Sequence, residues 1–342
     1  MTVEMVRPMR SMRPGMKEVV GDLYKKYGQR KPMGESSPST WQPHFFLHRT
    51  FLGDQDLLII FNTKRCKYRC HFCQLPAKSS PTLIPGSEIV SQFSFVVKEL
   101  KHSLSVLDRL TFSNEGSVLD ASTFPTEALL EIAEGINELR RVRTLVLETR
   151  LEFVDIDVLA QIREIAPRLS LNILTGFETH DPYLRNQVLF KREPLDVFER
   201  GLDRVAQAGA QLTTYVLFKP RWDMSDEEAV AEAEASIDYL AAQTKMRGLD
   251  FSVRLNPMYA ADGSRWAKKA HVSPDYKPPR LTDVMRVAEK KRQEGVKIYI
   301  GMSTEGLDDG SNYLAREDYS PSLIKPVLLF NSGKIDSFSG YL

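Results

Sequence analysis

The sequence predicts an α/β fold built on a parallel β-sheet. Apolar, β-branched runs alternate with stretches in which apolar residues recur at the 3.6-residue period of a helix. The expected strands cover residues 57–62, 109–113, 144–149, 171–175, 211–218, 251–256 and 297–301. Strand–helix alternation of this kind, repeated about six times, is typical of right-handed βαβ units. Such a sheet either opens as a doubly wound fold or curls towards a barrel, and periodicity alone does not choose.

Two of the expected helices have recognisable ends. Apolar positions from Val197 to Ala206 follow the helical period, and Gly209 then provides a C-cap. A second helix runs over residues 224–244. It opens with Ser225 as its N-cap and has Glu228 three residues later, which is the pattern of a capping box.

Composition and charge are those of an ordinary folded protein. Hydrophobic residues make up 42% and charged residues 27% of the chain, and Lys+Arg 46 against Asp+Glu 45 leaves a net charge of +1. This balance produces no global field that would attract nucleic acid or a membrane surface. No apolar run approaches the roughly 18 residues of a membrane span, and the charged N-terminus lacks the apolar stretch of a secretory signal. We therefore expect a cytoplasmic protein with no membrane partner.

The ends of the chain differ from its centre. Residues 1–50 contain nine Lys/Arg against four acidic residues, and a short helix is expected over residues 16–27. We interpret residues 1–50 as a basic arm packed on a core domain of residues 51–305, followed by a C-terminal extension of residues 306–342. A solvated arm is the usual meaning of such a charge run, and a lid or a phosphate-facing surface is the alternative.

The three cysteines carry the clearest chemical signal. Cys66, Cys70 and Cys73 lie within eight residues, directly after the first expected strand. Their odd number and close spacing argue against a disulfide framework, whereas clustered reduced thiols are typical of a metal site. Three thiolates can hold three corners of an iron–sulfur cubane and leave the fourth iron open to a small molecule. The alternatives are free buried cysteines, or a structural zinc site with His71 as a fourth ligand folded back on its own loop.

Polar side chains recur where the expected strands end. In a parallel sheet these ends meet at one edge, where α/β proteins gather their binding sites. The candidate ligand contacts at that edge are Ser113, Asn114, Glu115, Glu148, Arg150, Glu178, Tyr215 and Lys219. Charges placed repeatedly at this position indicate a binding site, although each turn taken alone is also compatible with an ordinary loop.

The C-x3-C-x2-C spacing, with Phe72 directly before the last cysteine, is similar to the signature of the radical S-adenosylmethionine (SAM) superfamily. This resemblance implies a partial (β/α)6 TIM-like barrel of the radical SAM type. It also implies a [4Fe–4S] cluster bound by Cys66, Cys70 and Cys73, with SAM on the open iron. In that superfamily one electron cleaves SAM to methionine and a 5′-deoxyadenosyl radical, which fits a one-electron donor such as flavodoxin or ferredoxin.

The strand-end blocks, over roughly residues 55–305, resemble those of archaeosine synthase radical SAM subunits and related elongator-type proteins. The resemblance implies that Ser113, Asn114 and Glu115 bind the SAM ammonium, with Glu115 as its counter-ion. It further implies that Glu148 and Arg150 contact the SAM ribose or carboxylate and that Lys219 meets the carboxylate. Glu178, Tyr215 and Phe72 complete the expected cofactor contacts. Glu115 and Leu151 depart from the subgroup pattern, which leaves the substrate open.

Three functions follow from this reading. The near-neutral charge favours an enzyme that acts on a small, nucleoside-like metabolite. The basic arm, together with Lys268, Lys269, Lys277 and Arg280, fits the alternative of an enzyme that modifies a tRNA base. An iron–sulfur sensor or scaffold without turnover would explain the cysteines but not the polar strand ends.

Overall fold

The computed structural model describes residues 40–51, 53–73, 75, 79–114, 116–261, 263–302 and 319–342. Within these ranges the sheet consists of β1 (Phe45–Phe51), β2 (Asp54–Ile60), β3 (Arg109–Ser113), β4 (Thr144–Glu148), β5 (Ser170–Glu178), β6 (Gln211–Phe218), β7 (Phe251–Pro257) and β8 (Lys297–Ile300). The α-helices are α2 (Gly86–Leu100), α3 (Thr126–Asn137), α4 (Ile156–Ile165), α5 (Leu195–Gln207), α6 (Asp226–Met246), α7 (Arg265–Val272), α8 (Leu281–Gln293) and α9 (Pro321–Asn331). Short turns of other helical type are η2 (Lys101–Val106), η3 (Leu151–Phe153) and the π-helical η4 (Leu184–Val188).

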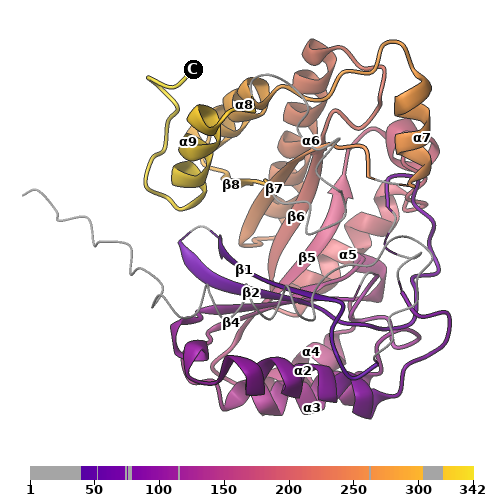
Figure 1. Ribbon diagram of the computed structural model, residues 1–342, viewed down its shortest axis with the longest axis vertical. Coiled ribbons are helices and arrows are strands. Elements are labelled where there is room, and N and C mark those ends of the chain that lie inside the picture. Colours follow the sequence, from indigo (N-terminus) through magenta and orange to yellow (C-terminus); the bar gives the residue numbers. More distant parts are fainter. Residues whose placement is uncertain are drawn as a thin grey trace, which may run out of the picture.

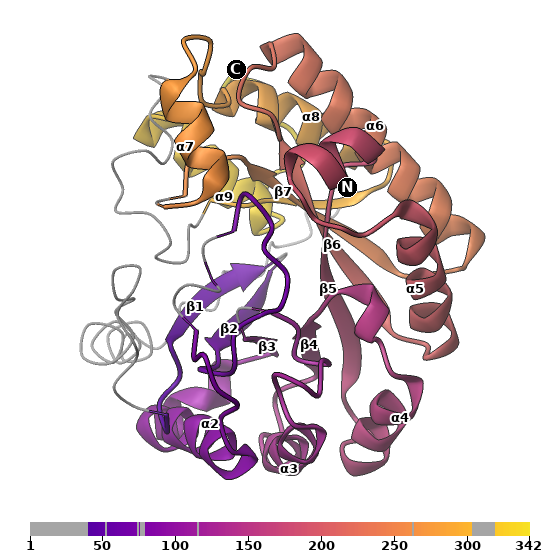
Figure 2. The ribbon, with the colours of Figure 1, turned by 90° about the vertical axis from the view of Figure 1, so that its right-hand side faces the viewer.

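The strand order answers the question that periodicity left open. The strands lie side by side in the order in which they occur in the chain, from β1 to β8, and β2 to β8 are all parallel. A doubly wound sheet would reverse its order at a switch point, whereas a sequential order winds the sheet in one direction, as in a barrel. Figures 1 and 2 show the strands curled along an arc with helices on its outer side. The expected partial barrel is therefore confirmed.

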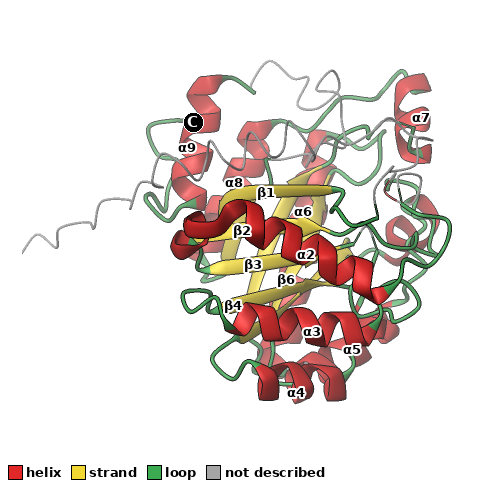
Figure 3. Ribbon diagram, turned by 60° about the horizontal axis from the view of Figure 1, so that its bottom comes forward, coloured by secondary structure: helices red, strands yellow, loops and turns green. Residues whose placement is uncertain are grey.

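The two faces of the sheet have different chemistry. Figure 3 shows helices lying along one face of the sheet. Side chains on this helix-covered face are apolar, and they form one continuous core with α2, α3, α4, α5, α6 and α8. Because side chains alternate along a strand, the residues between them face the concave side, and many are polar. On β7, for example, Val253 and Leu255 belong to the core, while Arg254 lies near the rings of Tyr215 and Tyr299, 5.3 and 5.7 Å from their centroids. The inside of the partial barrel is therefore suited to polar ligands.

The local predictions agree with the structure wherever it describes them. All seven expected strands are present, most within a few residues of the predicted ends. Ser225 and Glu228 form the predicted capping box of α6, and Gly209 follows α5 with a positive φ of 61°. The sequence did not predict β1, which pairs antiparallel with β2 and lies in what was expected to be a basic arm. The expected helix over residues 16–27 lies outside the described residues.

The C-terminal segment packs on the sheet. Phe330 and Phe338 are fully buried in the core and stack on each other at 4.6 Å. The Asn331 side chain accepts a hydrogen bond from the Ile300 backbone N–H and donates one to the Ile300 carbonyl, both 2.8 Å long. The last helix therefore covers the outer edge of β8. Among the described residues, no helix is both long and apolar enough to cross a bilayer.

We predict that Gly201→Ala destabilises the protein by about 1–3 kcal/mol through overpacking. Gly201 lies in α5, and an added Cβ would collide with the Leu151 Cβ and approach its carbonyl oxygen to 3.2 Å. Urea denaturation of the purified variant measures the loss. Gly86→Ala is the matched control, because its Cβ would meet Ala128 at an ordinary 3.4 Å. Equal stability of the two variants would mean that η3 and α5 pack loosely.

Candidate cofactor site

The cysteine loop follows β2 at the carboxyl edge of the sheet. Cys66, Cys70 and Cys73 are all half-buried, and none forms a disulfide. Gly116, in the loop after β3, lies directly against Cys66: a Cβ on this glycine would stand 3.2 Å from the Cys66 Cβ. The absence of a side chain at Gly116 therefore allows the first two loops of the barrel to pack closely.

His71 anchors the cysteine loop to the turn that follows η4. Its backbone N–H donates to the Leu189 carbonyl at 2.8 Å, and its Nδ1 lies 3.0 Å from the Val188 carbonyl oxygen. Its ring stacks on Phe190 with 4.6 Å between centroids and an interplanar angle of 12°. On the other side, the backbone N–H of Trp266, at the start of α7, donates to the His71 carbonyl at 2.9 Å. His71 thus has a structural part in holding the loop.

Phe72 lies in an apolar cluster beneath α7. It packs against a group of buried residues that includes Leu189, Leu217, Met258 and Trp266. The structure thus places the Phe72 ring against protein side chains, and a contact between Phe72 and SAM stays a prediction.

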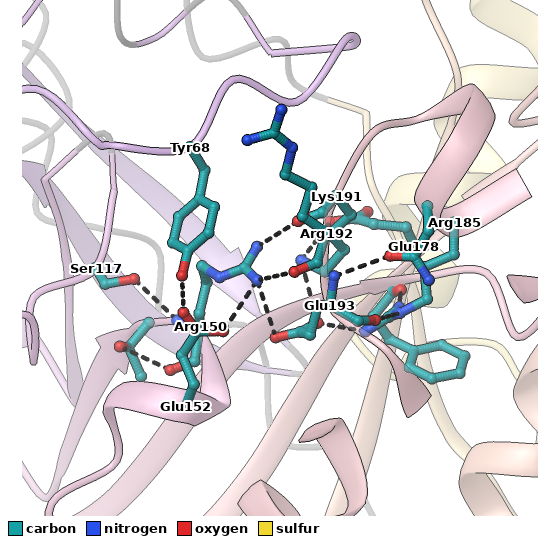
Figure 4. Close-up of polar contacts among 12 residues, drawn as sticks. Tyr68, Ser117, Arg150, Glu152, Glu178, Arg185, Lys191, Arg192 and Glu193 are labelled. Atoms are coloured by element: carbon teal, nitrogen blue, oxygen red, sulfur yellow. Dashed lines mark hydrogen bonds and ion pairs between the residues drawn. The ribbon is translucent and has the colours of Figure 1, made fainter. Parts of the chain in front are cut away.

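Arg150 lies at the centre of the contacts between the cysteine loop and the rest of the barrel (Figure 4). Its guanidinium carbon lies 3.8 Å from the centroid of the Tyr68 ring. One terminal nitrogen donates to the Lys191 carbonyl at 3.0 Å, and the other donates to Glu152 Oε2 at 3.0 Å and to the Arg192 carbonyl at 3.4 Å. The Tyr68 hydroxyl also donates to Glu152. Arg150 therefore joins the cysteine loop to the loop before α5.

A cluster of buried charges continues from Arg150 towards β5 and η4. Arg185 and Glu193 are completely buried and form an ion pair, and the Lys191 ammonium lies 3.6 Å from Glu193 and 3.7 Å from Glu178. Glu178 has a φ of 72°, and its carboxylate fills the space that a side chain on Gly176 would need. Gly176 is therefore required for this carboxylate to fold back beneath Lys191.

The pKa values of the two buried carboxyl groups in this cluster, Glu178 and Glu193, are shifted in opposite directions. Burial raises the pKa of Glu178, and the nearby Lys191 only partly opposes it. Burial also acts to raise the pKa of Glu193, but Lys191, Arg185 and Arg150 together hold it below its usual range. Carboxyl groups with opposite shifts in one cluster are typical of functional sites, and structural ion-pair networks produce them too.

The loop after β3 contains the residues expected at the SAM ammonium. Ser113 and Asn114 are buried, and the Asn114 amide donates to the Ser117 carbonyl and the Thr123 hydroxyl, both at 3.2 Å. The Asn114 Oδ1 is buried, and among the described residues it has no hydrogen-bond partner. Glu115, the expected counter-ion, lies outside the described residues.

The remaining predicted cofactor contacts are Glu148, Tyr215 and Lys219. Glu148 ends β4, beside Leu174 of β5, and its carbonyl accepts from Val118 at 3.0 Å. Tyr215 lies on the concave side near Arg254. Lys219 is buried with a φ of 67°, and its ammonium donates to Asp226 in the first turn of α6 at 2.7 Å. Arg150 and Glu178 therefore lie near the cysteine loop, whereas the Lys219 ammonium binds to α6.

Several residues of the site were missed by the sequence analysis. They are Tyr68, Glu152, Arg185, Lys191 and Glu193. Tyr68 was visible as an aromatic residue between two cysteines, and the charged run 191–193 before a proline was visible as a turn. Their contacts join positions as far as 84 residues apart in the chain, and nothing in the local pattern indicates such pairs.

The donor set of the loop fits an iron–sulfur cluster by its chemistry. Three free thiols share one loop, as cluster ligands do. Burial raises the pKa of Cys66 and Cys70, and the charges of Arg150 and Lys191 oppose this only in part. Within the described ranges, however, no three His, Cys, Asp or Glu residues are gathered closely enough to hold a metal ion. The assignment of the three thiols as ligands therefore rests on their chemistry, and the structure does not give their arrangement around a metal.

Comparison with known proteins finds similarities of sequence and of fold. No model of a known protein family matches the sequence. The chain is 23% identical over 308 residues to an uncharacterised protein of Methanocaldococcus jannaschii, covering 85% of this chain and 82% of that protein. It is 24% identical over 237 residues to archaeosine synthase subunit beta of Thermococcus kodakarensis, covering 68% and 70%. A structure of spore photoproduct lyase with a dinucleoside spore photoproduct superposes with a TM-score of 0.53 at 14% identity, covering 83% and 94%.

The likeness to spore photoproduct lyase is one of fold, and it agrees with the partial barrel that the cysteine motif implied. In sequence, the chain is similar to archaeosine synthase subunit beta, as its strand-end blocks implied.

We predict that the Cys66 and Cys70 thiols of the metal-free protein react with iodoacetamide at a rate that keeps rising above about pH 10, where a cysteine with the ordinary pKa of about 8.5 has levelled off. Burial raises the pKa of both the Cys66 and the Cys70 thiol, so the reactive thiolate forms only at higher pH. Peptide mass spectrometry after timed alkylation measures each cysteine separately. A plateau below about pH 8 would show that Arg150 and Lys191 outweigh burial.

Proposed function

We propose that the protein is a radical SAM enzyme that acts on a small, nucleoside-like substrate. The observation that carries this proposal is the position of three reduced cysteines on one loop at the carboxyl edge of a curled parallel sheet. When bound by Cys66, Cys70 and Cys73, a [4Fe–4S] cluster with SAM on its open iron would supply reductive cleavage of SAM and a 5′-deoxyadenosyl radical that takes hydrogen from the substrate. Flavodoxin or ferredoxin in the cytoplasm would supply the electron.

The surrounding residues would orient SAM. Ser113, Asn114 and Glu115 would bind its ammonium, and the buried Asn114 Oδ1 supports this role because it is an acceptor with no partner among the described residues. Glu148 would contact the ribose from the end of β4. These contacts would position SAM and exclude water, while the radical chemistry belongs to the cofactor.

The concave side of the barrel favours a polar, planar substrate. Tyr215, Arg254 and Tyr299 occupy neighbouring positions on β6, β7 and β8, so the guanidinium lies near two aromatic rings. Aromatic rings stack on planar bases, and a guanidinium donates several hydrogen bonds in one plane. A nucleoside-like molecule presents both features, and the similarity to archaeosine synthase subunit beta is consistent with it.

A second candidate function is modification of a base within tRNA. The observation that favours it is a group of exposed cations on α7, Arg265, Lys268 and Lys269, which stands beside the cysteine loop. Arg265 and Lys269 are close enough to His71 to act on its pKa. Figure 1 shows α7 beside the carboxyl edge of the sheet. Phosphate groups of a nucleic acid would bind such a surface.

We predict that the anaerobically reconstituted protein, given SAM and dithionite, releases 5′-deoxyadenosine detectable by mass spectrometry. The single variants Cys66→Ala, Cys70→Ala and Cys73→Ala would each lose one of the three thiolate ligands and release none. Failure of a fully loaded wild-type cluster to cleave SAM, with nucleoside substrates present, would contradict the enzyme and favour an iron–sulfur sensor or scaffold.

Salt dependence separates the two substrate classes. If tRNA is the substrate, we expect its affinity to fall at least about tenfold between roughly 50 and 200 mM salt, because phosphate contacts release counterions. Substitution of Arg265, Lys268 and Lys269 by glutamine would make the dependence shallower, as measured by fluorescence anisotropy of labelled tRNA. If the protein binds no tRNA, the substrate is the small metabolite. The same follows if neither the rise in salt nor the glutamine substitutions change the affinity for tRNA.

A further inference from the structure

The turn after η4 has an unusual backbone. Phe190 and Arg192 each have a φ of 54°, one on either side of Lys191. Residues other than glycine rarely adopt this left-handed conformation, and each such residue costs about 1–3 kcal/mol. Strain of this kind persists only where the surrounding contacts fix the backbone, and it is concentrated at functional sites.

Two sets of contacts fix this turn. From η4, the Arg185 carbonyl accepts from the Lys191 N–H at 3.0 Å, the Arg185 Nε donates to the Glu193 carbonyl at 2.7 Å, and the Asn186 side chain accepts from the Glu193 N–H at 2.9 Å. From the turn between β4 and η3, Arg150 donates to the carbonyls of Lys191 and Arg192. The turn is thus held from both sides by side chains of the protein itself.

The cysteine loop rests on this assembly at two points. Tyr68, between the first and second cysteines, stacks on the Arg150 guanidinium and donates to Glu152. His71, between the second and third, stacks on Phe190. We call Arg150, Glu152 and residues 188–193 the platform. Each interval between cysteines therefore carries at least one aromatic side chain that contacts the platform.

We infer that Arg150 is a positioning residue, which holds the cysteine loop against the platform and so supports the three thiols that would bind the cluster. The inference rests on the proposed function only in that the loop holds a cluster. It departs from the resemblance, which implied a contact between Arg150 and SAM. Both terminal nitrogens of Arg150 already donate to protein oxygens, and the Tyr68 ring covers the guanidinium. Lysine cannot reproduce this planar, forked geometry, even though it keeps the charge.

The test compares Arg150→Lys with Tyr68→Phe, which keeps the ring and loses only the hydroxyl bond to Glu152. We expect Arg150→Lys to lose iron to a chelator about tenfold faster than the wild type, as loss of supporting contacts around metal ligands does elsewhere. The rate of iron loss from Tyr68→Phe would lie between that of the wild type and that of Arg150→Lys. SAM affinity per loaded cluster, read from the change that SAM causes in the electron paramagnetic resonance spectrum, would stay within about twofold, because Arg150 does not bind SAM.

Arg168→Lys is the matched control. Arg168 donates to the carbonyls of Asn137 and Leu139 at 2.7 and 2.9 Å, so this change also removes a forked set of backbone contacts, but at positions that do not touch the cysteine loop. We expect iron retention in Arg168→Lys to equal that of the wild type. Equal loss of iron from both variants would overturn the inference, because the effect would then be general destabilisation.

Two further measurements distinguish a positioning role of Arg150 from a direct contact with SAM. If Arg150→Lys retains iron normally but binds SAM more weakly, Arg150 is a SAM contact and the inference is overturned. Hydrogen–deuterium exchange of the metal-free protein gives a readout that needs no cluster: exchange over residues 66–73 would rise in Arg150→Lys and not in Arg168→Lys. If the wild type never forms a cluster, the proposed function fails, and this exchange experiment still decides the role of Arg150.

Discussion

A cluster of paired buried charges determines how the candidate site is built. The cations Arg150, Arg185 and Lys191 and the carboxylates of Glu178 and Glu193 are nearly all removed from solvent beneath the cysteine loop. Buried charges are tolerated only when they are paired and hydrogen-bonded, so each member constrains the others. The strained turn, the left-handed Glu178 and the bare Gly176 are all consequences of bringing these groups together. A rigid support for the cysteines results from this pairing.

The parallel sheet explains why the site forms where it does. Because β2 to β8 run in one direction in sequential order, the loops after all of them meet at one edge. The cysteines come from the first of these loops, Arg150 from the third and the strained turn from the fourth. Residues far apart in sequence thus become neighbours, while the apolar face of each strand remains in a common core with the helices.

The sequence predicted what depends on local pattern. Strand positions, the Ser225 capping box and the cysteine loop follow from periodicity, cap chemistry and spacing. The sequence did not predict β1, because a short edge strand after a polar, proline-rich segment gives little periodic signal. It also did not predict the partners of Arg150, since its position at a strand end indicates a polar site but not whether the guanidinium faces a ligand or Tyr68. Long-range side-chain pairing is decided by packing, which one sequence alone does not reveal.

The Asn331 side chain has a consequence for how the protein behaves in a crowded solution. A partial barrel leaves the outer edge of its last strand open, and such an edge can recruit a strand from another chain and start aggregation. The amide of Asn331 binds both backbone groups of Ile300 as a neighbouring peptide would, so one side chain occupies the position where pairing with a foreign strand would begin. The last helix therefore protects the barrel from self-association while leaving it unclosed.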